Sequence, residues 1–385
     1  MGRVILSLIV LLVYSGVAAA QMKFPQGATK SVAAKTADTP APKPVKKKKA
    51  SPKPKGPPAK ELFGSVTTPA PLAARSIGSY SKGCLAGGIS LPINGPDWQV
   101  MRLSRDRNWG TPQLVDFLER FASDARALDG WPGLLVGDMS QPRGGPMLTG
   151  HTSHQVGLDA DIWLTPMPDR ILTPQERENI TAVSMLKDPF NVDPTKFTLQ
   201  QVKLIRRAAS YPQVARIFVH PAIKKALCQE ADLVGKDRSW LAKVRPWWNH
   251  YYHFHIRLKC PPGMDGCVNQ SPVSRDDGCG KELDNWYETL KKSAIWMARQ
   301  PPDYKPKKTK PPLRLRDLPS ACKSVLTAGG IEPLESDAEL PPTALVALAS
   351  KEAGPPAPRL TQTQLETLLN GGKLGMPLPD RNPKR

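Results

Sequence analysis

The histidines of this chain are concentrated in two short segments. Five of the six lie in residues 150–161, which read GHTSHQVGLDAD, and residues 249–255, which read NHYYHFH. Neutral imidazole is the commonest protein ligand for zinc, and histidine is also the side chain most often used as a general base. The clustering therefore predicts a metal site with further histidines around it.

Three metal ligands can be drawn from these segments. His154 and Asp161 come from the first segment, and His255 comes from the second. Zinc in a hydrolase usually takes three protein ligands and keeps one position open for water, whose pKa it lowers toward neutrality. Mixed histidine and carboxylate ligation suits zinc in an exported hydrolase, although the same donors also bind nickel or copper. We therefore expect one Zn2+ ion and water as the nucleophile.

The other clustered histidines, His151, His250 and His253, have no necessary ligand role. His253 shares a strand face with His255, so it is the best candidate to take the proton of water or to stabilise an oxyanion. His250 and His151 would orient His253, or His151 would be a further metal ligand. The isolated His220 is predicted to be structural.

Two strands with alternating side chains would position these groups. Residues 158–164 and 252–258 both alternate with a period of two, so each strand presents its polar side chains on one face. Those faces carry Asp159, Asp161 and Trp163 on the first strand, and His253, His255 and Arg257 on the second. Helices are predicted at 111–128, 198–210 and 221–228, and further strands at 134–136 and 214–219. Together these elements predict an α+β fold.

Arg143, Trp247 and Tyr251 are weaker candidates for substrate contact. Arg143 lies in a loop before the first histidine segment, where it would bind a carboxylate or simply face solvent. Trp247 and Tyr251 would line a groove for peptide or sugar, or would pack in the core as aromatic residues commonly do.

Composition divides the 385 residues into four parts. Residues 1–20 have the order of a secretory signal peptide, cleaved near Ala20, with an uncleaved N-terminal anchor as the alternative. Residues 21–75 form a Lys/Pro/Ala-rich segment that we expect to be a disordered tether. Residues 76–326 are the expected enzyme domain. Residues 327–385 are a Pro-rich tail that is mostly disordered, with short helices possible at 344–349 and 360–369.

The predicted compartment constrains the partners. No later stretch is apolar enough to span a bilayer, so export predicts a periplasmic protein. The net charge of +20 is concentrated toward the ends. A basic tether would contact an acidic wall polymer or a membrane surface, or would act only as a spacer, and export argues against nucleic acid.

The cysteines support the domain limits, because an even set of six lies within them. Three disulfides are expected in an oxidising compartment, and the absence of a Cys-x-x-Cys pair argues against a zinc ribbon. Fifteen pairings are possible, and only the short loop between Cys260 and Cys267 looks suited to closing on itself.

These residues resemble the penicillin-insensitive murein endopeptidase family. The resemblance runs from about residue 76 to 326 and includes all six cysteines. Its motifs are residues 143–161 (RGGPMLTGHTSHQVGLDAD), 216–219 (RIFV), 243–247 (KVRPW) and 250–255 (HYYHFH). The resemblance implies a zinc peptidase with His-x6-Asp and His-x-His motifs around a small antiparallel sheet, flanked by helices and disulfide-stapled loops.

The resemblance also implies roles for particular residues. The substrate would be peptidoglycan, cut at the D-alanyl to meso-diaminopimelyl cross-bridge. His154, Asp161 and His255 would hold zinc, His253 would activate water, and His151 and His250 would be further active-site histidines, with His151 sometimes counted with the metal. The implied disulfides are Cys84 with Cys322, Cys228 with Cys279, and Cys260 with Cys267.

One motif of the family is missing. Family members can carry a further metal-binding pair, an aspartate followed three residues later by a histidine. The corresponding residues here are Asp188 and Asn191. One zinc ion is therefore expected, and a second is not.

Three other functions compete with this interpretation. A D,D-carboxypeptidase or dipeptidase would commonly use Glu-x-x-His, but His250 stands three residues before His253, which favours an endopeptidase. A non-catalytic, zinc-dependent cell-wall binding module requires a misplaced His253. A basic nucleic-acid or membrane-surface protein would explain the charge but not the histidines.

Overall fold

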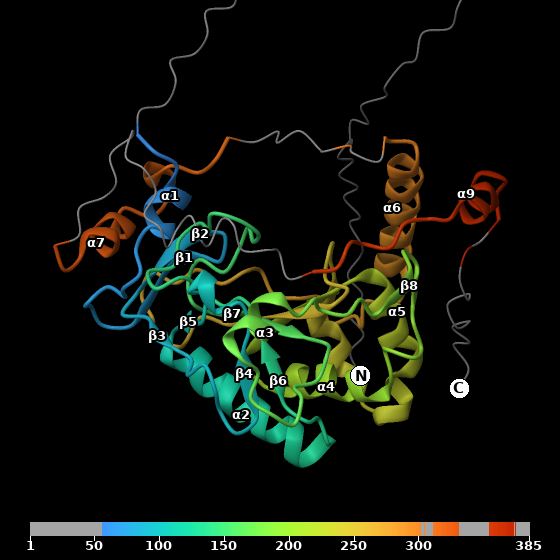
Figure 1. The fold of residues 1–385 in the computed structure, drawn as a ribbon, viewed down its shortest axis with the longest axis horizontal. Helices are drawn as coiled ribbons and strands as arrows, with labels where there is room; N and C mark the ends of the chain where they lie inside the picture. Colours follow the sequence, from blue (N-terminus) through green and yellow to red (C-terminus); the bar gives the residue numbers. More distant parts are fainter. Residues whose placement is uncertain (1–55, 302–303, 305–310, 331–353, 373, 375–385) are drawn as a thin grey trace, which may run out of the picture. The chain divides into compact units, whose positions relative to one another are not determined.

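The computed structural model describes residues 56–301, 304, 311–330, 354–372 and 374, which all belong to one compact unit, Pro54–Arg385 (Figure 1). The predicted signal peptide, residues 21–55 of the predicted tether and the possible helix at 344–349 lie outside the described residues. No helix in the described part of the chain combines the length and hydropathy needed to cross a bilayer.

A six-stranded sheet forms the centre of this unit. Its strand order is β11 (Val244–Pro246), β10 (Val214–Val219), β12 (His253–Leu258), β7 (Asp159–Trp163), β6 (Leu134–Val136) and β4 (Trp98–Val100). The four inner strands pair antiparallel, whereas each edge strand pairs parallel with its neighbour. The α+β class is confirmed, and the sheet is larger and more mixed than the small antiparallel sheet that we expected.

Helices cover one face of this sheet. They are α2 (Pro112–Asp129), α4 (Leu199–Ser210) and α5 (Pro221–Glu230). Phe121 of α2 and Ile205 of α4 join Phe254 and Ile256 of β12 in one buried apolar cluster. Because strand side chains alternate, packing these residues against helices leaves the polar residues of β12 on the opposite face.

The helix ends follow from local sequence. Thr111 is the N-cap of α2 and accepts a hydrogen bond from the Leu114 amide, Pro112 occupies the first turn, and Gly130 ends the helix with φ of 72°. A side-chain oxygen at the N-cap and a glycine in the left-handed region satisfy backbone groups that the helix leaves unpaired. These signals are why the predicted helix at 111–128 matches α2 within a residue.

The other predicted elements are also confirmed, with ends shifted by at most two residues. The predicted strands at 134–136 and 214–219 are β6 and β10, and the predicted helices at 198–210 and 221–228 are α4 and α5. The possible helix at 360–369 corresponds to α9 (Gln362–Leu369). The α6 helix (Lys281–Ala298) was not predicted, because only Leu283 and Leu290 of its side chains are buried. The remaining elements are α1 (Ala59–Gly64), β1 (Arg75–Ser79), β2 (Lys82–Ala86), β3 (Ile89–Ser90), η1 (Leu103–Arg105), β5 (Trp109–Gly110), α3 (Pro174–Asn179), β8 (Leu186–Asp188), β9 (Asn191–Val192), η2 (Ala231–Val234), η3 (Ser239–Lys243), η4 (Leu315–Asp317) and α7 (Ala321–Thr327).

The predicted tether is shorter than expected. Residues 56–75 were assigned to it, yet α1 packs beside α7 in a cluster that includes Phe63 and Leu326, and Phe63 is fully buried (Figure 1). Leu62 and Phe63 supply the apolar surface that the preceding Lys/Pro stretch lacks. The assignment of residues 56–75 to a disordered tether is therefore wrong.

All three implied disulfides are present. Cys84 on β2 is joined to Cys322 on α7, Cys228 on α5 to Cys279 just before α6, and Cys260 to Cys267 within one loop. The first bridge joins cysteines that are 238 residues apart in sequence, and it therefore links the two ends of the domain. The second anchors the start of α6 to the helix layer.

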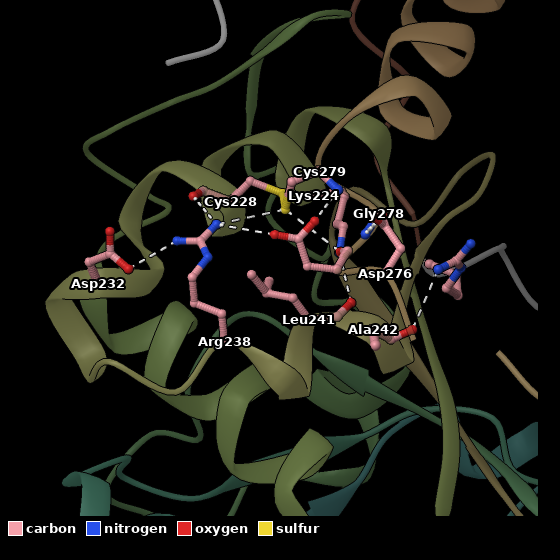
Figure 2. The surroundings of a disulfide bond; sticks show 11 residues. Lys224, Cys228, Asp232, Arg238, Leu241, Ala242, Asp276, Gly278 and Cys279 are labelled. Carbon is pink, nitrogen blue, oxygen red and sulfur yellow. Dashed lines mark hydrogen bonds and ion pairs between the residues drawn. A yellow bond between two sulfur atoms is a disulfide. The ribbon is translucent and has the colours of Figure 1, made fainter. Parts of the chain in front are cut away.

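A buried lysine lies beside the second disulfide (Figure 2). The Lys224 side chain is inaccessible to solvent, and its ammonium donates to the carbonyls of Leu241 (2.8 Å) and Asp277 (2.6 Å). Burial, reinforced by the nearby Arg245 charge, lowers the pKa of Lys224 to about 7. Two neutral acceptors hold the ammonium without balancing its charge.

Stability should therefore rise with pH because of Lys224. An unfolded lysine keeps its proton to a pKa near 10.5, so the unfolded chain binds more protons than the folded chain between about pH 7 and 10. We expect the free energy of unfolding to gain up to about 1.4 kcal/mol per pH unit in this window, relative to Lys224→Met. Denaturant titrations at several pH values measure this difference. The exposed Lys187→Met is the control, and equal slopes in the two variants would contradict the assignment.

Candidate active site

The pairing of β12 with β7 brings the two histidine segments together. In this antiparallel register, His255 is opposite Asp161, His253 is opposite Trp163, and Arg257 is opposite Asp159. All six side chains lie on the sheet face that the helices do not cover. The two faces predicted from alternation are therefore the same face of one sheet.

The loop before β7 holds His154 in a single orientation. Its backbone has φ of 68°, in the left-handed region, and its amide donates to Asp159 Oδ2 at 3.1 Å. The His154 carbonyl accepts from Ser140 Oγ, and the ring Nδ1 donates to the Met139 carbonyl at 2.7 Å. With Nδ1 used in this way, the lone pair of Nε2 faces the strand residues.

Two candidate ligand nitrogens lie close to one buried oxygen of Asp161. His154 Nε2 and Asp161 Oδ1 are buried, have no hydrogen-bond partner among the described residues, and lie 3.5 Å apart. His255 Nδ1 is 3.7 Å from the same Asp161 oxygen. Tetrahedral zinc with ligand distances of 2.0–2.1 Å separates its ligand atoms by about 3.3 Å. The 3.5 Å spacing of the two orphaned atoms fits a cation held by His154 and Asp161, and His255 Nδ1 lies near the same Asp161 oxygen.

His151 reaches the same carboxylate from the other side. Its Nε2 is 3.0 Å from Asp138 Oδ2 and 3.5 Å from Asp161 Oδ2. His151, His154 and Asp161 each offer a ligand atom, and these atoms lie within 4.8 Å of one another. His151 would have to give up its hydrogen bond to Asp138 to bind a metal, whereas Nε2 of His154 is already free.

A buried aspartate fixes the orientation of His255. Asp159 is inaccessible to solvent, and its Oδ1 accepts from His255 Nε2 (2.9 Å) and Arg257 Nε (2.7 Å). Burial alone would raise the pKa of Asp159, but Arg257 and His255 hold it well below the usual range. The ionised Asp159 keeps the proton of His255 on Nε2 and directs Nδ1 toward Asp161. Such carboxylate–histidine pairs usually orient metal ligands.

Asp138 is a second buried carboxylate that the sequence analysis missed. It accepts from Arg105 (3.1 Å) and Arg107 (2.8 Å) as well as His151, and these groups hold its pKa well below the usual range against the opposing effect of burial. Asp138 follows β6 in a loop dense in glycine and proline, where no periodic pattern marks it. Its position directly after a predicted strand was the only signal available.

The reactive histidines differ in their surroundings. His253 is 5% exposed, its Nε2 is 3.5 Å from Asp161 Oδ2, and its Nδ1 has no hydrogen-bond partner in the described part of the chain. Burial outweighs the Asp161 charge and lowers the pKa of His253, which favours a neutral ring. The His250 ring lies 5.0 Å from that of His253, and its Nδ1 donates to the Trp248 carbonyl. Burial lowers the pKa of His250 as well.

The histidines open into a groove with a volume of about 730 Å³. Trp247 and Tyr251 both line it; Trp247 is 51% exposed, whereas Tyr251 is buried and also belongs to the main apolar cluster. Trp286 of α6 makes edge contacts with Trp247 and Trp248, so three tryptophans form one wall. Trp286 was not foreseen, because the helix that carries it was not predicted.

Arg143 does not face this groove. It is 1% exposed and donates to the carbonyls of Thr68, Val325, Leu326 and Ala328. These carbonyls belong to the end of α7 and to the segment after α1. The prediction that Arg143 contacts a substrate carboxylate is corrected to a structural role that joins the two ends of the domain.

Two other residues singled out in the sequence have local structural partners. His220 is the N-cap of α5, where its ring accepts from the Ala222 amide, and burial lowers its pKa to about 3. The Asp188 carboxylate accepts from the Asn191 side chain at 3.0 and 3.1 Å. The Asn191 amide thus donates hydrogen bonds to the Asp188 carboxylate oxygens that a second metal would need as ligands.

Comparison with known proteins identifies the family of this chain. The sequence profile of the penicillin-insensitive murein endopeptidase family matches residues 76–327. The chain belongs to this family. A penicillin-insensitive murein endopeptidase of Haemophilus influenzae is 46% identical over 220 residues, covering 57% of this chain and 75% of the relative. Proteins of the same name from Klebsiella pneumoniae and Escherichia coli are each 41% identical over 262 and 266 residues, covering 68% of this chain and 89% of each relative.

The hydrogen bond from His255 to Asp159 should set metal affinity. In Asp159→Asn the amide cannot balance the charge of Arg257 or hold the proton on Nε2 of His255, so we expect divalent zinc to bind about 10- to 100-fold more weakly. Competition with a fluorescent chelator measures the dissociation constant. The exposed Asp116→Asn is the control. Unchanged affinity in Asp159→Asn, with the fold retained, would show that Asp159 does not orient the site.

Proposed function

We propose that this protein is a zinc-dependent D,D-endopeptidase that hydrolyses the D-alanyl to meso-diaminopimelyl cross-bridge of peptidoglycan. Membership of the murein endopeptidase family supports the substrate class. The observation that carries the zinc assignment is the approach of His154 Nε2 (3.5 Å) and His255 Nδ1 (3.7 Å) to the same buried oxygen of Asp161, with His255 also lining the open groove. Two nitrogens and one carboxylate oxygen are donors that zinc prefers.

His154, Asp161 and His255 would hold the ion. Zinc bound there would polarise the scissile carbonyl and lower the pKa of a water molecule. Beside these ligands is a cavity of about 20 Å³, bounded by His151, Asp161 and His253 among others. A cavity of this size accommodates one water molecule. The nucleophile therefore has a place next to the carboxylate and two imidazoles.

His253 is placed to move the proton. Its lowered pKa keeps the ring neutral, so it can accept a proton from the attacking water. The protonated ring would then donate to the leaving amine, while the buried carboxylate of Asp161 stabilises the imidazolium at 3.5 Å. His250, 5.0 Å away between ring centres, would hold the oxyanion or orient His253.

His151 would have a positioning role. Asp138 accepts its Nε2 proton, and Arg105 and Arg107 fix that carboxylate. The ring therefore presents a fixed edge to the water-sized cavity. Because the attack uses water, the mechanism needs no serine nucleophile for a penicillin to acylate, which accounts for insensitivity to the drug.

The groove suits a peptide with charged ends. Arg216, Arg245 and three tryptophans line it, and Arg245 is also paired with Glu282. Guanidinium groups bind carboxylates, which cross-linked stem peptides carry, and tryptophan faces pack against sugar rings or aliphatic side chains. A periplasmic location, signal cleavage near Ala20 and attachment of the basic residues 21–55 to the wall or membrane surface complete the proposal.

The cleavage assay is the decisive experiment. Purified mature protein should convert cross-linked muropeptide dimers to monomers, and a chelator should abolish the conversion until zinc is restored. Mass spectrometry identifies the products. If dimers stay intact although zinc is bound, the protein is a wall-binding module and not an endopeptidase. If terminal D-alanine is released from monomers, the protein is a carboxypeptidase instead.

Two histidine variants should separate metal binding from proton transfer. His253→Ala should retain zinc, because the three proposed ligands remain, but its kcat should fall about 10²- to 10⁴-fold. His154→Ala should lose both zinc and activity. Elemental analysis and dimer turnover on the same samples measure the two effects. A fully active His253→Ala variant would refute its role as general base.

A further inference from the structure

The C-terminal segment returns to the enzyme domain although it lies beyond the family match. The matched region ends at residue 327, whereas residues 354–372 are again packed against the same unit. The α9 helix begins with a capping box in which Thr361 accepts from the Gln364 amide and Gln364 accepts from the Thr361 amide. Its start is therefore specified by its own sequence.

One leucine docks this helix. Leu368 is 6% exposed and packs in a cluster with Leu290 of α6 and Phe190, whereas the next residue, Leu369, is 50% exposed. Figure 1 shows α9 beside α6. Leu368 is the only buried residue of α9, and the partly buried Leu360 and Leu374 on either side of the helix pack against the same cluster, so the attachment is centred on Leu368.

The residues that lead into α9 pass along the active-site groove. Tyr251 Oη donates to the Pro355 carbonyl at 2.6 Å, and both residues line the groove together with His250 and His253. Gly354 lies so close to Tyr252 that an added Cβ would be 2.3 Å from its ring. The backbone therefore makes close contact with the two tyrosines that follow His250.

The same helix that seats α9 also forms the aromatic wall. Trp286, on α6, contacts Trp247 and Trp248, while Leu290, one turn later, contacts Leu368. The groove is thus bounded by α6 on one side and by Gly354 and Pro355 at the tyrosines. A substrate that extends past Tyr251 must displace the backbone that this hydroxyl already binds.

We propose that residues 354–369 form an end wall of the substrate groove and set the size of substrate that the enzyme accepts. The proposal rests on the function proposed above. A soluble muropeptide dimer has free ends that fit a groove closed at one end, whereas intact sacculi continue into glycan strands on both sides of each cross-bridge. The wall therefore selects against the polymer. Burial of one leucine shifts the docked population roughly 10- to 100-fold.

The test releases α9 in the full-length protein. Leu368→Asp places a charge in the apolar contact, and Leu369→Asp introduces the same charge at an exposed neighbour. Hydrogen exchange should show protected amides in residues 365–369 of the wild type and of Leu369→Asp, and rapid exchange in Leu368→Asp. Rapid exchange in the wild type would overturn the proposal, because no wall would then be in place.

Substrate preference is the functional readout. In Leu368→Asp, kcat/KM for intact sacculi should rise about 3- to 10-fold relative to kcat/KM for the muropeptide dimer, and Leu369→Asp should match the wild type. Tyr251→Phe, which removes the hydroxyl that donates to Pro355, should shift the ratio in the same direction by less. An unchanged ratio in Leu368→Asp, with its α9 amides exposed, would refute the proposal while leaving the cleavage activity standing.

A binding assay separates this proposal from the proposed function. Cosedimentation with sacculi and calorimetry with the dimer measure retention without turnover. If no variant cleaves either substrate, a selective gain of sacculus retention in Leu368→Asp still supports the wall, and equal retention by all variants refutes it.

Discussion

The antiparallel register between β7 and β12 is the constraint on which the site depends. Because His255 is paired with Asp161, and Arg257 with Asp159, two segments about a hundred residues apart present their polar groups on one sheet face. A shift of one residue would turn His255 toward the helix layer and bring Phe254 to the site. The register is fixed from the other face, where Phe254 and Ile256 are packed against Phe121 and its neighbours. The apolar core thus determines which atoms can meet the metal.

The charges buried on that face show why a cation would suit this site. Asp138 and Asp159 are each neutralised by arginines, but no arginine contacts Asp161 among the described residues, and it faces imidazoles only. A carboxylate out of contact with water must be paired, so histidines would have to take up protons at this point if no metal were present. The pKa of His154 is raised accordingly, since the nearby Asp161 outweighs its burial, while the pKa of His255 falls to about 4. A divalent ion would take the place of that proton and satisfy all three ligand atoms together.

Sequence patterns located the strands and the histidines but not their supporting groups. Alternation predicted the faces of residues 158–164 and 252–258, and helix-capping residues predicted α2 and α4. Asp138 was missed because its role comes from arginines more than thirty residues away in sequence. Arg143 was misjudged for a related reason: its partners near residues 68 and 326 meet only after the Cys84–Cys322 bridge and α1 close the domain. Contacts between distant, non-periodic residues leave no local pattern.

The helix α6 shows how such a missed element connects the site to the rest of the chain. Few of its side chains are buried, and each part of the helix contacts a different partner. Glu282 in its first turn pairs with Arg245, Trp286 contacts the groove tryptophans, and Leu290 packs against α9. The Cys228–Cys279 disulfide fastens its beginning to α5. The family match covers residues 76–327, which include the sheet that holds the histidines, whereas Gly354 and Pro355 lie beyond that match. The candidate ligands therefore lie within the sheet or in the loop before β7, whereas the groove is also lined by Trp286 of α6 and by Gly354 and Pro355 from outside the matched region.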